Sequence, residues 1–529
     1  MKKKVFLQII LGIAAFMLLL MLLTKGVVEP WIGKKIQTSL NEKSDDFLIK
    51  IEKVHVSILR SGIELENITL QSKSENEGQS GLYGEIESVK FKGIHLIKAF
   101  FRKDIDIKEV DVFNSRLTGI YAMQKKNAGA NVSPVNIRIE NLFFDQFFVD
   151  LKDTATAQTY FVEDGILKLY DIHVDKQDTI STDIFGQFDL DLPEFKTVTA
   201  DSLYTFTAVG INYSATSKIL TADSFAMQPN YTEYGFTDQS QFITSRFEGR
   251  FSQLSFYDFS APDFVKSGKM TSSYIEIGEA ELHVFRDKRK IDRHIIKPTF
   301  QEMFYNYPGT LNIDSIGILH ANIVYSVHAE KSIEKGSISF NEIDAKIYKI
   351  TNDTIYKTEK AYLELKANAL LMGKGKVVVS LKSRLFDKQN TFAVHGTVSE
   401  MEASALNSIV EKISFISITR GNINGFNFSF SANNTQATGT LRLLYEGLKF
   451  EILNKQTGES TALAEQVKSL IANMIVLESN PIPGEAVRPG IIEYERDPEK
   501  FLFNYVVKAL MSGLKTSVTK TKSPKKSKK

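Results

Sequence analysis

The sequence predicts a mainly β protein, in which an N-terminal transmembrane helix precedes an elongated antiparallel β-sheet, with a few short helices near the ends. Three observations support this class. Residues 5–23 form a nearly continuous apolar run, residues 49–430 alternate between apolar and polar side chains, and helical spacing returns only after residue 460. A period of two is typical of strands, whereas a period near 3.6 is typical of helices.

Composition excludes several classes of site. The chain has 529 residues, of which 43% are hydrophobic and 24% charged, and it contains no cysteine. It therefore has no disulfide framework, thiolate metal site, iron–sulfur cluster, cysteine nucleophile or lipoprotein anchor. Residues 514–529 hold seven lysines and no acid, although the whole chain carries a net charge of only +2, so the body is mildly acidic. We expect no nucleic-acid partner for such a body, and the basic tail favours an anionic surface.

The first 25 residues predict a membrane anchor. The apolar run over residues 5–23 is close to the roughly 20 residues with which a helix crosses a bilayer. No small-residue cleavage site follows it, so we interpret it as an uncleaved signal anchor. The lysines at positions 2–4 place the N-terminus in the cytoplasm and the rest of the chain across the membrane. No other apolar run approaches this length, which predicts a single-pass protein.

The residues after the anchor predict a short amphipathic helix. Pro30 suits a first helical position, and Ile32, Ile36 and Leu40 recur every four residues. Trp31 is the only tryptophan of the chain. It stands where an interfacial aromatic side chain would contact the membrane, or it packs within the fold.

A repeated apolar phrase runs through the β region. Its form is apolar-x-apolar-x-x-apolar-x-apolar, and it recurs about every 30 residues. The gap of two residues is what one extra bulge residue would produce, because the bulge returns later side chains to the same face. The copies begin at Ile49, Ile105, Ile137, Leu167, Leu311 and Ile338.

The apolar positions of this phrase are our candidates for the lining of a groove. A sheet with one apolar face and too little helix to cover that face must close on itself or hold an apolar ligand. The candidates are Ile49, Ile51, Val54, Val56, Ile105, Ile107, Val110, Val112, Ile137, Ile139, Leu167, Leu169, Ile313 and Ile316.

Helices are expected again near the C-terminus. Apolar residues at helical spacing predict one helix over 462–477, and Asp497 with Pro498 predicts the start of a second, whose apolar stripe runs from Leu502 to Leu514. Either the second helix and the lysine tail contact a membrane surface, or the helix packs on the fold and the tail is solvated. The candidates for membrane contact are Trp31, Leu510, Lys525 and Lys526.

Sequence patterns for catalysis are weak. Hydrolase, zinc-protease, dinucleotide and phosphate-loop motifs are missing. Asp171, His173 and Asp175 alternate along one strand and are the best metal candidate, but a solvated strand face explains them more simply. The same holds for the paired carboxylates Asp189 and Asp191. We therefore expect no enzymatic activity, no catalytic residue, no metal site and no cofactor.

The two ends of the chain resemble AsmA-like proteins. The anchor, the short helix and the stretch Gly62-Ile63-Glu64-Leu65-Glu66-Asn67-Ile68-Thr69-Leu70 follow the order of features that opens that superfamily. Residues 421–425, 439–449 and 493–498 are similar to its closing domain. The resemblance covers about the first and last 120 residues, and the lysine tail has no counterpart in it.

This resemblance implies a fold and a function. It implies a bacterial inner-membrane protein whose periplasmic body is a bent, taco-shaped β-groove of the bridge-like lipid transfer type. The implied role is phospholipid transfer in outer-membrane biogenesis, and the implied partners are phospholipid, the inner membrane and either the outer membrane or an envelope protein. A different class is a non-catalytic periplasmic scaffold or assembly factor for outer-membrane proteins, in which the groove is filled by its own side chains.

The same reasoning predicts five segments of the chain. They are the cytoplasmic stub and anchor over 1–25, an N-terminal helix and β-groove over 26–200, central β-groove repeats over 201–420, a C-terminal domain with amphipathic helices over 421–513, and a disordered lysine-rich tail over 514–529.

Overall fold

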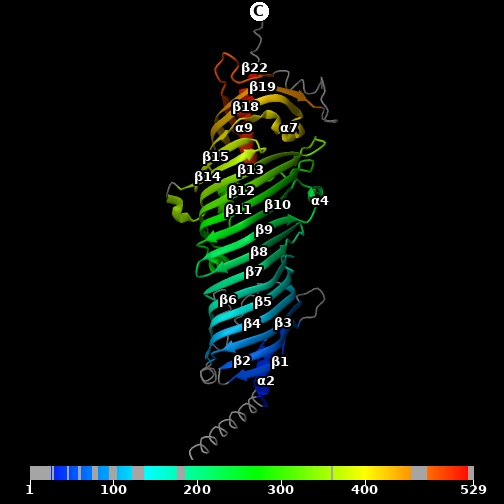
Figure 1. Cartoon of the computed structure of the whole chain (residues 1–529), viewed down its shortest axis with the longest axis vertical. Coiled ribbons are helices and arrows are strands. Elements are labelled where there is room, and N and C mark those ends of the chain that lie inside the picture. Colours follow the sequence, from blue (N-terminus) through cyan, green and yellow to red (C-terminus); the bar gives the residue numbers. More distant parts are fainter. Residues whose placement is uncertain are drawn as a thin grey trace, which may run out of the picture. The chain divides into compact units, whose positions relative to one another are not determined.

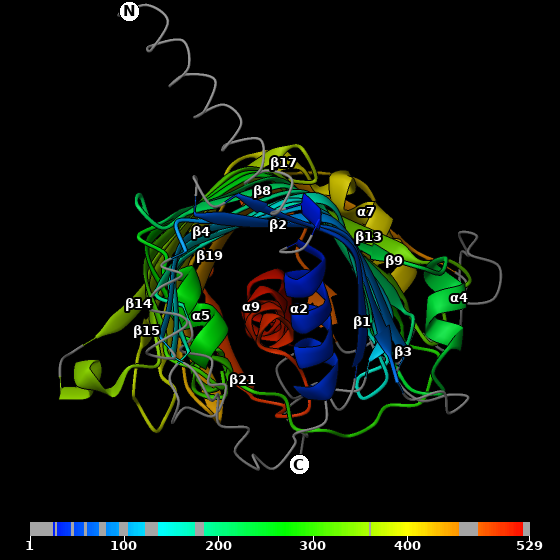
Figure 2. The same cartoon turned by 90° about the horizontal axis from the view of Figure 1, so that it is seen from below.

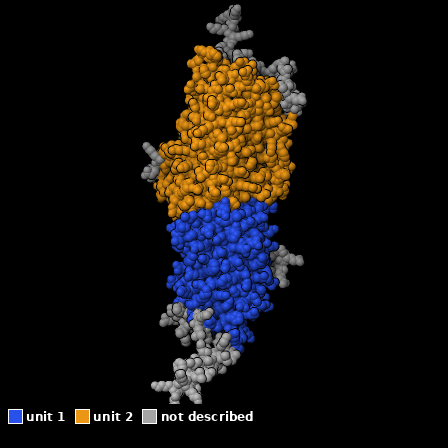
Figure 3. All heavy atoms as spheres, viewed as in Figure 1, with its two compact units in different colours: residues 1–223 blue, residues 224–529 orange. Residues whose placement is uncertain are grey.

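The structure is a computed structural model that describes residues 25–26, 29–43, 47–57, 61–73, 81–94, 104–121, 136–174, 185–358, 361–453 and 474–521. The chain forms two compact units, Met1–Asp223 and Ser224–Lys529, which Figure 3 colours separately. The expected anchor over 5–23 and the lysines beyond residue 521 lie outside the described residues. Within the described ranges, no helix is long and apolar enough to span a membrane.

Unit 1 contains a helix and a sheet in which each strand pairs with the next one along the chain (Figure 1). The helix lies on the inner side of the curved strands (Figure 2). The elements are α2 (Glu29–Lys43), β1 (Phe47–Ser57), β2 (Gly62–Ser72), β3 (Gly81–Lys92), β4 (Asp104–Tyr121), β5 (Asn136–Asp153), β6 (Thr159–Val174), β7 (Gln187–Val198) and β8 (Tyr204–Ser214). β9 (Ile219–Pro229) contains the boundary between the units.

The helix α2 is fixed to the backbone of β1. The Asn41 side chain donates to the Ile49 carbonyl over 2.8 Å and accepts from the Ile49 N–H over 2.7 Å. The carboxylate of Glu29, near the start of the helix, accepts from the Val56 N–H over 2.9 Å. Ile36 packs against the apolar side chains of the sheet, as the spacing of the expected amphipathic helix predicts. These contacts satisfy backbone groups of an edge strand that would otherwise be open to another chain.

Opposing kinks explain the two-residue gaps in the repeated phrase. Ile51 pairs with Ile68 and Lys53 with Glu66, so Glu52 and Asn67 face each other without a change of register. Asn67 has a left-handed backbone, with φ of 53°. A single left-handed residue turns the following side chains to the other face. The expected bulge therefore exists, but here both strands kink together instead of one strand carrying an unpaired residue.

The same device recurs across the sheet of unit 1. Asp171 in β6 has φ of 52° and lies between the pairs Ile139–Ile172 and Asn141–Tyr170, which is the gap in the copies that begin at Ile137 and Leu167. Asn114 in β4 is a further case, since it lies opposite Glu87 without a change of register. At the left-handed Gln146 and Asp164 the register of β5 and β6 shifts instead, so ordinary bulges occur there. Through these kinks, apolar side chains before and after the gap share one side of the sheet, as Leu65 and Ile68 do in β2.

Two strand pairs differ from the antiparallel pattern that the sequence predicts. β4 and β5 are parallel, with Ile105 beside Ile137 and Val110 beside Leu142, so two copies of the phrase lie side by side in register. β11 and β12 are also parallel. Parallel neighbours need a crossover of about a dozen residues or more, and residues 288–310 supply one between β11 and β12.

Unit 2 is also mainly β. Its elements are α4 (Glu233–Asp238), β10 (Ser245–Tyr257), α5 (Ala261–Ser267), β11 (Met270–Asp287), α6 (Phe300–Tyr305), β12 (Leu311–His328), β13 (Gly336–Thr351), η2 (Thr354–Thr358), β14 (Tyr362–Leu371), β15 (Gly375–Arg384), β16 (Phe392–Val398), β17 (Met401–Glu402), η3 (Ala403–Leu406), α7 (Asn407–Ser414), β18 (Ile416–Ala432), β19 (Gln436–Ile452), β20 (Met474–Val476), β21 (Gly490–Glu495), α9 (Leu502–Val518) and β22 (Thr519–Thr521). Figure 2 shows α9 inside the curve of these strands, with α4 and α7 outside.

The C-terminal helices differ from their predicted bounds. Met474–Val476, the end of the helix expected over 462–477, is a strand that pairs with β22, and residues 462–473 lie outside the described ranges. The last helix begins at Leu502 with Phe501 as its N-cap. The Asp497 side chain accepts from the Glu499 N–H over 2.9 Å, so this residue closes a turn before the helix instead of capping it.

Candidate functional site

An apolar groove on the inner side of unit 1 is the candidate functional site. Its volume is about 470 Å³, and residues of α2 and of the strands β1 to β6 line it. The lining residues are Leu40, Ile49, Ile51, Leu65, Ile68, Leu70, Gly84, Ile86, Val89, Phe91, Ser115, Arg116, Leu117, Phe144, Phe147, Phe148, Val149 and Leu167. Ligand sites in proteins commonly occupy about 300–1,000 Å³, so the groove has a suitable size.

The kinks concentrate apolar side chains in this groove. In β2, Leu65 lies three residues before Ile68, so in a regular strand the two side chains would face opposite sides of the sheet. Both line the groove, because the left-handed Asn67 between them turns Ile68 to the same side as Leu65. In β4, Leu117 lines the groove after the left-handed Asn114. The groove is therefore a direct product of the repeated gaps in the sequence.

Polar residues at the kinks bond to their neighbours. The Asn67 side chain donates to the Glu52 carboxylate over 3.0 Å, and the Asn114 side chain donates to the Glu87 carboxylate. Arg116 is the one ionisable residue among the described residues of the lining, and its guanidinium carbon lies 3.8 Å from the centre of the Phe148 ring. Charge is thus nearly excluded from the groove.

The structure places the predicted lining residues in four environments. Ile49, Ile51 and Leu167 line the groove itself. The apolar cluster of the same unit buries Ile107, Val110 and Val112. Packed against that cluster are Val54, Ile105 and Ile139. The remaining candidates of unit 1 are half-buried in their strands, namely Val56, Ile137 and Leu169. Ile313 and Ile316 belong to a separate cluster of unit 2.

Several lining residues were missed as candidates. Ile68 and Leu70 lie after the gap in β2, Ile86 lies before one in β3, and Phe147 lies after one in β5. The two-residue gap is present in β2 as Ile63, Leu65, Ile68 and Leu70, so the same periodicity was enough to find them. Leu40 was expected on a helix but not in the groove.

A second, polar space lies beside α2. Its volume is about 840 Å³, and charged residues such as Lys25, Glu29 and Lys53 contribute to its lining. The His55 Nε2 lies 3.6 Å from the Glu66 carboxylate, and the Lys53 Nζ lies 3.5 Å from the same side chain.

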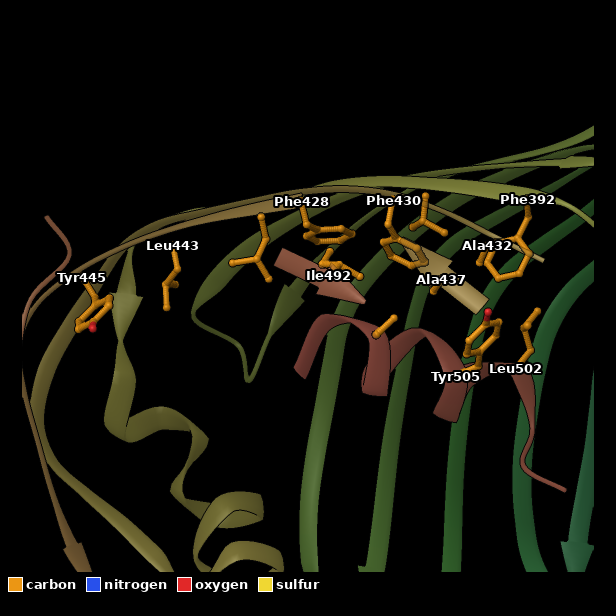
Figure 4. Packing of buried hydrophobic residues seen from close by; sticks show 13 residues of the cluster. Phe392, Phe428, Phe430, Ala432, Ala437, Leu443, Tyr445, Ile492, Leu502 and Tyr505 are labelled. Atoms are coloured by element: carbon orange, nitrogen blue, oxygen red, sulfur yellow. The ribbon is translucent and has the colours of Figure 1, made fainter. Parts of the chain in front are cut away.

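In unit 2, the inner side of the sheet is partly covered by the chain itself. Figure 4 shows α9 beneath β18 and β19, with Leu502 and Tyr505 turned toward Phe392 and Phe430. Burial raises the pKa of Tyr505 to about 12. Near Ile313, Phe304 of α6 and Tyr307 pack against another buried cluster.

The expected membrane contacts lie in different surroundings. Trp31 is 53% exposed, with the Lys35 Nζ 5.0 Å from the centre of its ring. Leu510 packs against the buried cluster beneath β18 and β19. Lys525 and Lys526 lie outside the described residues.

The weak catalytic candidates have structural contacts. Asp189 accepts from the Tyr170 hydroxyl over 2.6 Å and from the Ala215 N–H over 2.8 Å. Burial, followed by this bond to Asp189, raises the pKa of Tyr170 to about 12. Asp171 is a kink residue, and Asp175 lies outside the described residues. The described part of the chain holds no group of three side chains that could bind a metal ion.

Comparison with known proteins finds no family model that matches this chain and no curated protein that is significantly similar to it in sequence.

Proposed function

We propose that this protein is a membrane-anchored carrier of phospholipid, that the acyl chains lie in the groove of unit 1, and that it serves outer-membrane biogenesis from the periplasmic side of the inner membrane. The observation that carries this proposal is the groove itself, whose lining contains a single ionisable residue in the described chain. Each acyl CH₂ group that leaves water for such a lining gains about 0.8 kcal/mol.

The shape of the groove supports a mobile ligand. Apolar side chains from successive strands form the lining, so neighbouring positions offer a chain nearly the same environment. Movement between such positions requires no chemical step, because apolar contacts are non-directional. The AsmA-like resemblance of the two ends of the sequence agrees with this function and suggests the cellular location.

A scaffold or assembly factor is the alternative, and one observation favours it. In unit 2 the protein covers its own sheet, since α6 and α9 pack against buried clusters there. A sheet that is filled by its own side chains throughout would bind no lipid. The two functions therefore differ in whether lipid occupies the groove of unit 1.

Photo-crosslinking in cells separates the two functions. A benzophenone amino acid at Leu117 would face the groove, whereas the same group at Ile120, which is 41% exposed and is not part of the lining, would lie outside it. We expect phospholipid adducts, identified by mass spectrometry of the full chain, at position 117 and not at 120. Equal adducts at both positions, or none at 117 in a chain of normal abundance, would contradict a carrier.

A further inference from the structure

Unit 2 contains a cluster of cations on the same side of the sheet as α9. Val284 pairs with Tyr325, and the Tyr325 ring lies 6.4 Å from the ring of Phe503 on α9. Arg286 follows Val284 by two residues and therefore shares its side of the strand. Phe285 faces the other way, with its ring 5.2 Å from that of Tyr234 on α4. Arg286 thus points into the concave side that Figure 2 shows around α9.

The cations of this cluster lack acidic partners. Among the described residues, Arg286, Lys288 and Lys508 form no ion pair, and the buried Nε of Arg286 has no hydrogen-bond acceptor. Partial burial, followed by the charges of Arg286, Lys508 and Lys500, lowers the pKa of Lys288. Asp292 is the acid that faces Lys288, but it already binds the Lys500 ammonium over 2.6 Å. Neighbouring positive charges repel one another, so their arrangement is unfavourable unless a bound anion compensates them.

An apolar strip runs beside these cations. Phe503, Val507 and Met511 follow one another at intervals of four along α9 and are exposed by 54%, 37% and 53%. The opposite face of the helix, with Leu502, Tyr505 and Ala509, is the one that packs on the sheet. Positive charge next to an exposed apolar strip matches a ligand with an anionic head and a hydrocarbon tail.

We propose that Arg286, Lys288 and Lys508 bind the phosphate of an anionic phospholipid whose acyl chain lies along Phe503, Val507 and Met511. This inference rests on the proposed carrier function, and it assigns headgroup selection to unit 2, whereas the groove of unit 1 has almost no charge with which to select. Arg286 contributes a planar fork that can bond two phosphate oxygens, and the two lysines contribute mobile charges.

The test uses the full chain in cells with the benzophenone group at Met511. In an otherwise unchanged chain we expect phospholipid adducts that are enriched in anionic species over the membrane pool. In the triple variant Arg286→Gln, Lys288→Gln and Lys508→Gln, we expect the anionic-to-zwitterionic ratio of the adducts to fall about tenfold. The control variant Lys346→Gln, Lys366→Gln and Lys388→Gln removes the same charge from exposed positions of unit 2 and should leave the ratio unchanged.

Other outcomes identify which proposal fails. A ratio that does not respond to the triple variant, a protein adduct in place of lipid, or no adduct at Met511 while Leu117 still gives one would overturn this inference alone. Loss of lipid at both positions would overturn the carrier function as well.

The Tm of the triple variant checks its folding. Because the substitutions relieve repulsion among the three cations, we expect this Tm to equal that of the parent or to exceed it. A large fall in Tm would show that these side chains are structural.

Discussion

At the scale of single residues, left-handed backbone positions determine which side of the sheet each strand segment presents. Asn67 and Asn114 adopt this conformation and use their side-chain amides to bond the neighbouring Glu52 and Glu87. Asparagine tolerates a left-handed backbone better than most residues because its short polar side chain can bond locally. The kink therefore combines a backbone turn with a polar contact on the side of the sheet away from the groove.

The backbone requirement at Asn67 can be tested directly. Asn67→Val places a β-branched residue at φ of 53° and should lower the free energy of unfolding by about 1–2 kcal/mol. Asn67→Gly keeps the conformation accessible and should be nearly neutral. Thermal unfolding followed by circular dichroism measures both. Equal effects of the two substitutions would show that the side-chain bond to Glu52 matters and the backbone conformation does not.

Tyr505 links stability to alkaline pH. Its pKa is raised from 10.0 to about 12, so the folded protein favours the neutral phenol. The contribution of this neutral phenol to the free energy of unfolding is complete below pH 10.0, and it is lost as the pH rises toward about 12, because the unfolded chain then loses the proton first. In Tyr505→Phe, the fall of Tm across this range should be shallower than in the parent. An unchanged slope in Tyr505→Phe would contradict this assignment.

The sequence predicts the kinks only in part. A gap of two residues in the apolar alternation predicts where the side chains change phase, for example at Glu52 between Ile51 and Val54. It does not predict that the partner strand kinks at the opposite residue, because the pairing of β1 with β2 is a tertiary property. Ile68 and Leu70 did not depend on that pairing, because the gap after Leu65 shows the same pattern within β2 itself.

At the scale of elements, α9 depends on small residues for its close approach to the sheet. A Cβ atom at Gly513 would lie 2.5 Å from the Leu441 Cδ2 and 2.7 Å from the Ile492 Cγ1. Neither side chain has room to move, since both belong to the buried cluster beneath the helix. The apolar spacing of the sequence predicts a helix here, but it does not predict that Ala509 and Gly513, and not Phe503 and Met511, form the buried face.

Substitution at Gly513 tests this packing. Gly513→Leu should overfill the contact and cost about 1–3 kcal/mol of stability, or displace α9 from the sheet. Gly425→Leu is the matched control, since a Cβ there would meet nothing within 4 Å. Thermal unfolding and limited proteolysis after residue 501 report the two effects. A Gly513→Leu protein as stable and as resistant as the control would show that α9 is not held by this face.

At the scale of the whole molecule, the apolar residues of the repeated phrase lie in different surroundings in the two units. In unit 1 some of its apolar side chains, such as Ile49 and Leu167, line an open groove, whereas Ile313 and Ile316 in unit 2 join a cluster that includes Phe304 and Tyr307. The short helix α6, which supplies Phe304, has too few residues to show an apolar period in the sequence. The mainly β class was thus predictable from alternation, but the covered and uncovered parts of the sheet were not.

The central claim is that phospholipid occupies the groove of unit 1. The most direct measurement is lipid mass spectrometry on residues 25–529, produced without the N-terminal apolar run and purified without detergent, with β content checked by circular dichroism. We predict phospholipid in amounts comparable to protein, a clear loss in Leu117→Asp, and no loss in Ile120→Asp, because Ile120 is exposed and is not part of the lining. A folded protein that carries no phospholipid, or an equal amount in both variants, would contradict the account.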